Sequence, residues 1–232
     1  MTPDEQKRAA AKAALSYVKP GMKLGLGTGS TAAHFIDGLG EMVKGGLKVT
    51  CVPTSAATHK QAKSLNIPLT TLDKDPYLDL TVDGADEIDP NFNLIKGGGG
   101  ALLLEKIVAS SSRHVLIIAD ASKKVKTLGA FPLPIEVVPF GIKATGWKIE
   151  RAFKIVGVSG KMVLRVSNGK PFVTDGGHAI IDCALGKIPD APRLAGLIST
   201  IPGVVDHGLF IGLAGIALIG TDKGVKTFKK PR

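Results

Sequence analysis

The chain has 232 residues, of which 44% are hydrophobic and 22% are charged, a balance typical of soluble globular proteins. No apolar run approaches the ~18 residues of a membrane helix, and the N-terminal segment MTPDEQKRAAAKAALSYVK lacks the apolar core of a signal peptide. The basic residues behind the net charge of +10 are dispersed, so we expect a cytoplasmic enzyme with an anionic substrate and no nucleic-acid or membrane partner.

The first half of the chain alternates helices and strands. Residues 4–19 predict a helix that stops at Pro20-Gly21, and a short strand, a glycine-rich turn and a helix from near Ser30 follow. Further strands are predicted at 47–55, 67–73, 78–89 and 113–122, and further helices at 56–66 and about 99–112. This alternation predicts an α/β fold with a doubly wound (Rossmann-like), mostly parallel sheet.

The pattern changes after about Gly129. Strand-like runs at 134–141, 161–167 and 171–183, with helices at about 144–156 and 192–199, predict a smaller α+β antiparallel module of ferredoxin-like type. Asn168-Gly169 is a strong hairpin signal between two of these runs. The closing strands of 215–230 are expected to return to the first domain. We therefore predict a catalytic α/β domain at 1–129 plus about 208–232, and a smaller domain at 130–207.

Neither the cysteines nor the histidines indicate a metal site. Cys51 and Cys183 lie far apart in the sequence and form no CxxC, so we interpret both as reduced, packed thiols. The five histidines show no metal-ligand spacing such as HxxxH. No metal is therefore expected.

The segment GLGTGST, residues 25–31, follows a strand and opens a helix, an arrangement that presents backbone N–H groups to a phosphate. Thr28, Ser30 and Thr31 add hydroxyl groups around Gly29. The glycines do not complete the GxGxxG fingerprint, and the second strand ends without an acidic residue, so a nicotinamide cofactor is not expected. A turn that needs glycine only for close packing is the alternative interpretation.

The segment VDGADEID places four acids at the carboxyl end of a strand, where ligands bind in open α/β sheets. We interpret Asp83 and Asp86 as site residues, because clustered carboxylates suit proton transfer. For Glu87 and Asp89 we favour solvated side chains. A solvated acidic loop or a divalent metal site are the alternatives for the cluster.

The segment KGGGGALLLEK ends on a glutamate whose surroundings are apolar. The helix neighbours on the same face as Glu105 are Ala101, Leu102, Val108 and Ala109. A carboxyl group in such surroundings can act as a general base, although pairing with Lys106 on the helix surface is an alternative. The glycines would let a ligand approach backbone amides beside Lys96.

The segment IADASKK places Asp120 and Lys123 at the end of another predicted strand. Taken alone, it favours a surface turn with a capping aspartate. Beside three similar loops, it predicts a substrate-binding lysine.

Together, GLGTGSTAAHFID, VDGADEID, KGGGGALLLEKI, ADASK, FPLPIEVVPF, VTDGG and IPGVVDHGLF resemble the motifs of ribose-5-phosphate isomerase of type A, in order and spacing. The resemblance covers the chain from Gly25 to about Gly220. It implies that D-ribose 5-phosphate and D-ribulose 5-phosphate are interconverted through an enediolate, without metal or organic cofactor, in the non-oxidative pentose phosphate pathway. It also implies a homodimer or homotetramer.

On matching positions, the resemblance makes Glu105 the general base that moves a proton between C1 and C2. Lys96 and the amides of Gly97, Gly98 and Gly99 would stabilise the enediolate oxygen. Asp83 and Asp86, which flank Gly84 and Ala85, would assist ring opening and orient the sugar hydroxyls. The remaining substrate-binding residues would be Thr28, Gly29, Ser30, Thr31, Lys123 and, from the N-terminal helix, Lys7.

Two positions depart from the family pattern. Leu104 stands where the family often has arginine, and Gly176-Gly177 stands where Asn-Gly is usual. Two other functions are weighed against the isomerase: a coenzyme A transferase, in which Glu105 would be a nucleophile, and a sugar-phosphate effector domain of a transcription regulator. The second would need a DNA-binding helix-turn-helix, and no segment of the chain predicts one.

Overall fold

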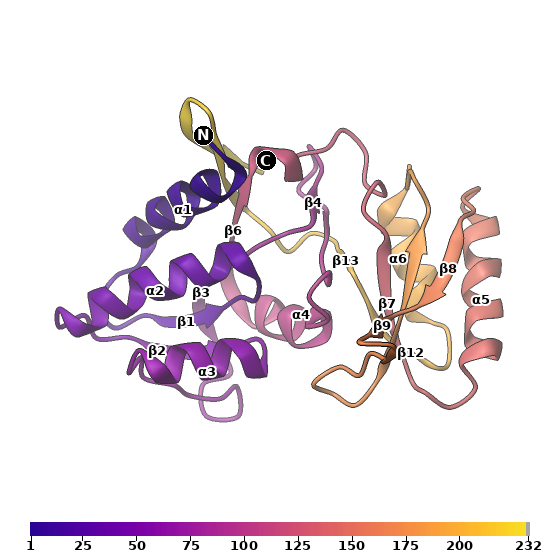
Figure 1. The fold of residues 1–232 in the computed structure, drawn as a ribbon, viewed down its shortest axis with the longest axis horizontal. Helices are drawn as coiled ribbons and strands as arrows, with labels where there is room; N and C mark the ends of the chain where they lie inside the picture. Colours follow the sequence, from indigo (N-terminus) through magenta and orange to yellow (C-terminus); the bar gives the residue numbers. More distant parts are fainter. Residues whose placement is uncertain (231–232) are drawn as a thin grey trace. The chain divides into compact units, whose positions relative to one another are not determined.

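The computed structural model describes residues 1–230, whose internal contacts form two compact units (Figure 1). Unit 1 consists of Met1–Ala85, Leu104–Lys124 and the chain from Gly212 onward, and unit 2 of Asp86–Leu103 and Val125–Ile211. Residues 86–103, which the predicted division placed in the first domain, thus lie in unit 2. The division into domains stays a prediction. None of the helices in residues 1–230 is long and apolar enough to cross a bilayer.

Unit 1 is built on a six-stranded sheet of order β15-β14-β6-β3-β1-β2, in which only β15 runs antiparallel to its neighbour. The strands are β1 (Lys23–Leu26), β2 (Thr50–Pro53), β3 (Leu78–Asp83), β6 (Ser112–Asp120), β14 (Ile216–Thr221) and β15 (Gly224–Lys229). The closing strands therefore do return to the first sheet. The predicted, mostly parallel α/β fold is confirmed.

Helices pack on both faces of this sheet. They are α1 (Pro3–Ala14), α2 (Ser30–Lys44), α3 (Ala56–Ser64) and α4 (Leu102–Ser110), with the short 3₁₀ helices η1 (Leu15–Tyr17) and η2 (Ala121–Lys123). Leu24 and Leu26 of β1 pack in the cluster formed with α1 and α2, whereas Gly25 between them faces Val108 of α4. Successive residues of a strand point to opposite faces, so α4 covers the face opposite α1 and α2.

Unit 2 contains a four-stranded antiparallel sheet of order β12-β7-β11-β8. Its elements are β7 (Leu133–Val137), α5 (Ile142–Ile155), β8 (Lys161–Leu164), β11 (Ala179–Ala184), α6 (Ala191–Ser199) and β12 (Val204–His207). This β-α-β-β-α-β succession confirms the predicted ferredoxin-like module. A second, three-stranded sheet of order β13-β5-β4 consists of β4 (Glu87–Ile88), β5 (Leu94–Ile95) and β13 (Leu209–Phe210).

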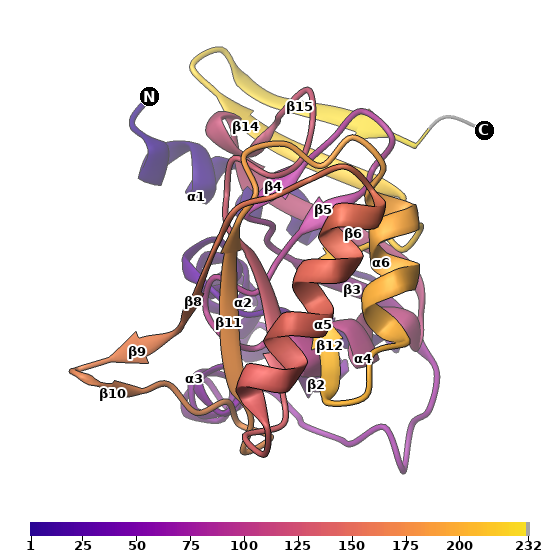
Figure 2. The ribbon, with the colours of Figure 1, turned by 90° about the vertical axis from the view of Figure 1, so that its right-hand side faces the viewer.

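A two-stranded ribbon, β9 (Val166–Ser167) and β10 (Lys170–Pro171), extends from β8 and β11 (Figure 2). Asn168 and Gly169 at its tip have φ angles of 51° and 74°. Positive φ at both central residues is what a type I′ hairpin requires. The hairpin prediction is confirmed.

The prediction of a strand at 67–73 is wrong. Its only ladder contact is an isolated bridge between Leu69 and Cys51, with hydrogen bonds from the Cys51 amide to the Pro68 carbonyl and from the Thr70 amide to the Cys51 carbonyl. The chain then turns, and the Thr70 hydroxyl donates to Asp75 over 2.6 Å. The preceding bond of a parallel ladder would need the N–H of Pro68 and the next bond that of Pro53 in β2. Proline has no N–H, so the pairing stays a single bridge.

Both cysteines are buried thiols, as predicted, with Cys51 in β2 and Cys183 in β11. Burial raises the pKa of the Cys51 thiol from 9.0 to about 12. Burial, with a smaller effect of the Asp182 charge, raises the pKa of Cys183 to about 12 as well. A thiol is a poor nucleophile until it loses its proton.

We therefore expect neither cysteine to react with iodoacetamide in the folded protein at about pH 8, and both to react once guanidinium unfolds it. The folded protein keeps these protons up to about pH 12, whereas the unfolded chain loses them near 9.0. The stability that each thiol contributes is thus complete below pH 9.0 and is lost as the pH rises toward 12. Mass spectrometry of labelled peptides measures the reactivity, and rapid native labelling of either thiol would contradict the assignment.

Candidate active site

The turn after β1 uses its glycines for two different reasons. A Cβ at Gly25 would collide with Thr81, and one at Gly27 would collide with the carboxylate of Asp83. Close packing therefore accounts for these two positions. Gly29 instead has a φ of 109°, a conformation that side chains with a Cβ rarely adopt, and no Cβ contact would arise there. Gly29 thus shapes the entry into α2.

The N-terminus of α2 has the features of an anion site. Gly29 is its N-cap and provides no side-chain hydrogen bond to the first turn. The Lys7 ammonium, from α1, donates to the Ser30 hydroxyl over 3.1 Å. The helix dipole and the amides of the first turn favour a negative group here. The structure thus brings Lys7 and Ser30 together, as predicted for two substrate-binding residues.

Thr28 is fixed by a group of hydroxyls that sequence reasoning missed. Its Oγ1 lies 2.8 Å from Thr54 Oγ1, donates to Ser55 Oγ over 2.8 Å and lies 3.1 Å from Thr58 Oγ1. Ser55 also caps α3 by accepting from the Thr58 amide. The segment PTSAAT at the end of β2 could have indicated this group, because serine and threonine directly before a predicted helix are typical N-cap residues. The Thr28 side chain therefore joins the β1 turn to α3.

Asp83 joins the turns that follow β1 and β3. Its carboxylate is 1% exposed. Its Oδ1 accepts from the Thr28 amide over 3.1 Å and from the Gly84 amide over 2.7 Å. Because β6, β3 and β1 are adjacent and parallel, their carboxyl ends meet at one edge of the sheet. Asp83, Gly84 and the Thr28–Thr31 turn lie at that edge.

Lys123 follows β6 at the same edge. Asp120, which is buried, caps η2 by accepting from the amide and hydroxyl of Ser122, so the predicted capping role is present. The Ala121 amide donates to Gln6 Oε1 over 3.1 Å. Gln6 precedes Lys7 in α1, so this bond connects the Lys123 turn to the helix that carries Lys7. Sequence reasoning missed Gln6, because a glutamine in a helix gives no local signal of such a contact.

Glu105 is buried, with 4% of its surface exposed, in the first turn of α4. Its predicted same-face neighbours Ala101, Leu102, Val108 and Ala109 are buried as well. The prediction of an apolar face is confirmed. The alternative of a glutamate on a solvated helix surface is wrong.

In unit 2, Lys96 follows β5 and is buried. Its ammonium lies 5.5 Å from the centroid of the Phe210 ring, a cation–π distance. Its amide donates to the Gly208 carbonyl over 2.9 Å. Both the backbone and the side chain of Lys96 are therefore fixed against β13 and the residue before it.

The four glycines after Lys96 form a turn rather than the start of the helix, which begins at Leu102 instead of near Gly99. Gly97 and Gly100 have φ angles of 103° and 82°, and the Gly100 amide donates to the Gly97 carbonyl over 3.0 Å. The Gly98 amide donates to Asp86 Oδ2 over 2.8 Å. The structure thus brings Asp86 and Gly98 together.

The prediction of a solvated side chain is wrong for Glu87, whereas Asp89 is partly exposed. Glu87 is 3% exposed, and its two oxygens accept from the amides of Gly129 and Phe131 over 2.7 and 2.6 Å. Asp89 accepts from the amides of Asn91 and Asn93 over 2.8 and 2.9 Å. These acids fix turns of unit 2, which a run of acidic letters does not reveal.

The acidic segment does not assemble a metal site within the described part of the chain. In residues 1–230, no three His, Cys, Asp or Glu side chains are grouped so that they could hold a metal ion. Asp83 and Asp86 accept backbone amides in separate units. Metal-independent activity stays a prediction.

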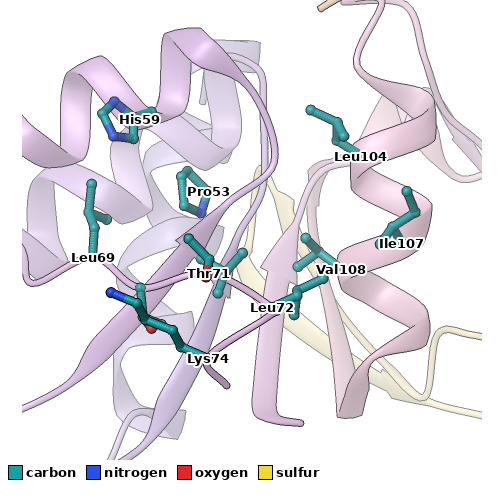
Figure 3. Close-up of a pocket in the computed structure, with 11 residues that line it drawn as sticks. Pro53, His59, Leu69, Thr71, Leu72, Lys74, Leu104, Ile107 and Val108 are labelled. Atoms are coloured by element: carbon teal, nitrogen blue, oxygen red, sulfur yellow. The ribbon is translucent and has the colours of Figure 1, made fainter. Parts of the chain in front are cut away.

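A pocket of about 480 Å³ opens in unit 1 between α4 and the 69–74 segment (Figure 3). It is lined by Val52, Pro53, His59, Leu69, Thr70, Thr71, Leu72, Lys74, Leu104, Ile107 and Val108. The predicted site residues do not line it, and its wall is mostly apolar. Leu104 belongs to this apolar wall, where the arginine usual in the family would place a charge.

The predicted site residues fall in both units. Unit 1 holds Lys7, Thr28, Gly29, Ser30, Thr31, Asp83, Gly84, Ala85, Glu105 and Lys123, and unit 2 holds Asp86, Lys96, Gly97, Gly98 and Gly99. Unit 1 provides a helix N-terminus with a lysine beside it and buried carboxylates, and unit 2 provides a lysine followed by a glycine turn.

Comparison with known proteins points to one family. The family described as ribose 5-phosphate isomerase A (phosphoriboisomerase A) matches residues 50–224. A ribose-5-phosphate isomerase A from Nitrobacter hamburgensis is 60% identical over 99% of this chain and 100% of its own length. Ribose 5-phosphate isomerase from Plasmodium falciparum has a TM-score of 0.93 at 41% identity, over 99% of this chain and 100% of its own. A D-ribose-5-phosphate isomerase solved in complex with phospho-erythronic acid has a TM-score of 0.91 at 40% identity, with 99% and 100% coverage.

The hydrogen bonds of Glu87 predict that replacing it with glutamine, its neutral isostere, destabilises the fold. In Glu87→Gln, the amide NH₂ would face a backbone N–H donor, so we expect the free energy of unfolding to fall by about 1–3 kcal/mol. The control is Glu150→Gln, which changes an exposed residue in a helical pair with Lys154 and should cost less than about 0.5 kcal/mol. Denaturant titration measures both, and equal effects would contradict the structural role of Glu87.

Proposed function

Since this chain belongs to the ribose 5-phosphate isomerase A family and is an isomerase, we propose that it interconverts D-ribose 5-phosphate and D-ribulose 5-phosphate through an enediolate. The observation that carries this proposal is the 60% identity to an isomerase of that name along the whole length of both chains. Its reaction would belong to the non-oxidative pentose phosphate pathway. A homodimer or homotetramer, and a cytoplasmic location, stay predictions.

The phosphate of the substrate would bind at the N-terminus of α2. Support comes from the uncapped first turn after Gly29 and from the Lys7 ammonium 3.1 Å from the Ser30 hydroxyl. A phosphate oxygen could replace the Ser30 hydroxyl as the acceptor for Lys7. Lys123, whose turn is bonded to α1 through Gln6, would add a second cation. Charge-assisted hydrogen bonds of this kind are the strong ones in phosphate recognition.

Glu105 would be the general base. In the aldose-to-ketose direction, its carboxylate removes the proton from C2, and the electron pair forms the C1–C2 double bond of the enediolate. As that bond forms, the C1–O π pair moves onto O1, which becomes the negative enediolate oxygen. The same proton is then returned to C1 while the proton of the C2 hydroxyl moves to O1 and C2=O forms, so that no atom is gained or lost. Its burial on an apolar helix face supports this role, because a carboxylate in apolar surroundings is a stronger base than one in water.

Lys96 and the glycine turn would stabilise the enediolate oxygen. Lys96 is buried and fixed, so its charge requires little reorganisation when the oxygen becomes negative. Backbone amides of Gly97–Gly99 are donors of the same kind. Asp83 and Asp86 would assist ring opening and orient the sugar hydroxyls, since both carboxylates are already aligned by backbone amides.

The assignment of the base predicts the effect of Glu105→Gln. We expect a coupled assay with ribose 5-phosphate to show wild-type turnover that persists in a chelator, and a fall in kcat of about 10³-fold or more in the variant. Glu150→Gln is the matched control and should keep wild-type kcat. A near-normal rate for Glu105→Gln would contradict the assignment of the base, and loss of wild-type activity on chelation would contradict the metal-free mechanism.

The phosphate site predicts a different kinetic signature for Lys7→Gln. Loss of one charge-assisted bond to a group that does not react should raise KM about 10-fold and leave kcat within about 2-fold. Lys12→Gln changes an exposed lysine of the same helix and should leave both constants unchanged. A fall in kcat at unchanged KM would show that Lys7 acts on the reacting atoms instead.

A further inference from the structure

Arg165 occupies the point in unit 2 where the chain leaves β8 and enters β9. Its amide donates to the Ile180 carbonyl over 2.8 Å, and its carbonyl accepts from the Phe172 amide over 2.9 Å. The side chain is only 13% exposed. The backbone that carries the guanidinium is therefore fixed from both sides.

The guanidinium joins β11 to the glycine turn after Lys96. Its Nε donates to Asp182 Oδ2 over 2.8 Å and its Nη2 to Asp182 Oδ1 over 2.5 Å, a bidentate pair that fixes the plane of the group. Its Nη1 donates to two successive carbonyls, that of Gly97 over 2.9 Å and that of Gly98 over 3.2 Å. Asp182 thus orients Arg165, and Arg165 orients two peptide groups.

The planarity of the peptide group carries this orientation to the amides. In a trans peptide, the C=O of one residue and the N–H of the next point in opposite directions. Binding the Gly97 carbonyl therefore turns the Gly98 N–H away from Arg165, and this N–H donates to Asp86. Binding the Gly98 carbonyl turns the Gly99 N–H away from Arg165 in the same manner. Arg165 thereby sets the direction of two donors without contacting either.

Phe172 directly follows β10 of the same hairpin and packs against the other end of the glycine turn. A Cβ at Gly100 would collide with its ring, and the Arg165 guanidinium carbon lies 5.7 Å from the ring centroid. The φ of 82° at Gly100 closes the turn back onto the Gly97 carbonyl. The glycine turn thus packs against a cation and an aromatic ring, both from the segment 165–172.

We propose that Arg165, oriented by Asp182, is the positioning residue that aims the Gly99 amide for stabilisation of the enediolate and the Gly98 amide at Asp86. This inference rests on the proposed function, in which the Gly99 amide is an oxyanion donor and Asp86 orients the sugar hydroxyls. Because the Asp182 carboxylate neutralises the guanidinium, Arg165 acts through geometry rather than through its charge. An ion pair that only fastens the hairpin would affect stability and leave the turnover of folded protein unchanged.

The test compares Arg165→Lys with Arg151→Lys. A lysine cannot bridge a carboxylate and two carbonyls, so we expect kcat for ribose 5-phosphate to fall about 100-fold while KM stays within about 3-fold. Arg151 stacks on Trp147 in α5 and is the matched control, for which both constants should stay at wild-type values. Asp182→Asn keeps one of the two oxygens that accept from the Arg165 guanidinium, so we expect a smaller fall in kcat, of about 10-fold.

Hydrogen exchange provides a readout that does not depend on activity. In Arg165→Lys, we expect the amides of residues 97–100 to exchange about 10-fold faster or more, while those of β7 and α6 exchange at wild-type rates. If Arg165→Lys does not fold, both measurements are made on Asp182→Asn, whose smaller change preserves the size of the side chain.

The outcomes separate this inference from the proposed function. Unchanged kcat in a folded Arg165→Lys protein, or unchanged exchange at 97–100, would overturn the positioning role while wild-type isomerase activity stands. A wild-type protein without isomerase activity would instead overturn the proposed function, and the exchange measurement would still decide whether Arg165 orders the glycine turn.

Discussion

The carboxylate of Asp83 is the group on which the arrangement of unit 1 depends. A buried carboxylate is stable only where hydrogen bonds replace its lost hydration, and one oxygen of Asp83 meets this condition with the amides of Thr28 and Gly84. Those bonds fix the turns after β1 and β3 relative to each other. Gly27 has no side chain because Asp83 occupies that space. The start of α2, and with it the phosphate site proposed near Ser30, follows from the position of that turn.

Buried acids differ in their surroundings in this chain. Glu87 and Asp120 each accept two donors from neighbouring turns, so their charge stabilises the geometry of those turns. Glu105 differs in its setting, because it lies in the first turn of a helix whose same face is apolar. Burial alone therefore does not distinguish a chemical group from a structural one. The apolar neighbours of Glu105 are what support its proposed role.

Much of the fold could be predicted because its signals are local. The alternation of strands and helices, the Asn168-Gly169 hairpin and the return of the closing strands to the first sheet all agree with the structure. The strand predicted at 67–73 failed because an apolar run does not show how many partners it will pair with, and this one has a single bridge. The solvated assignment of Glu87 failed for a related reason: its donors lie 42 and 44 residues away along the chain.

The sequence by itself determined where the loops of the candidate site lie and the apolar face that carries Glu105, since each depends on spacing within one or two elements. Only the tertiary structure decided that the Thr28 hydroxyl faces α3, that Leu104 belongs to an apolar wall, and that Arg165 contacts Gly97, 68 residues earlier. Those contacts join segments whose own patterns are unaffected by the partner, so no local pattern could encode them. They exist because strand order and packing place distant side chains within bonding distance.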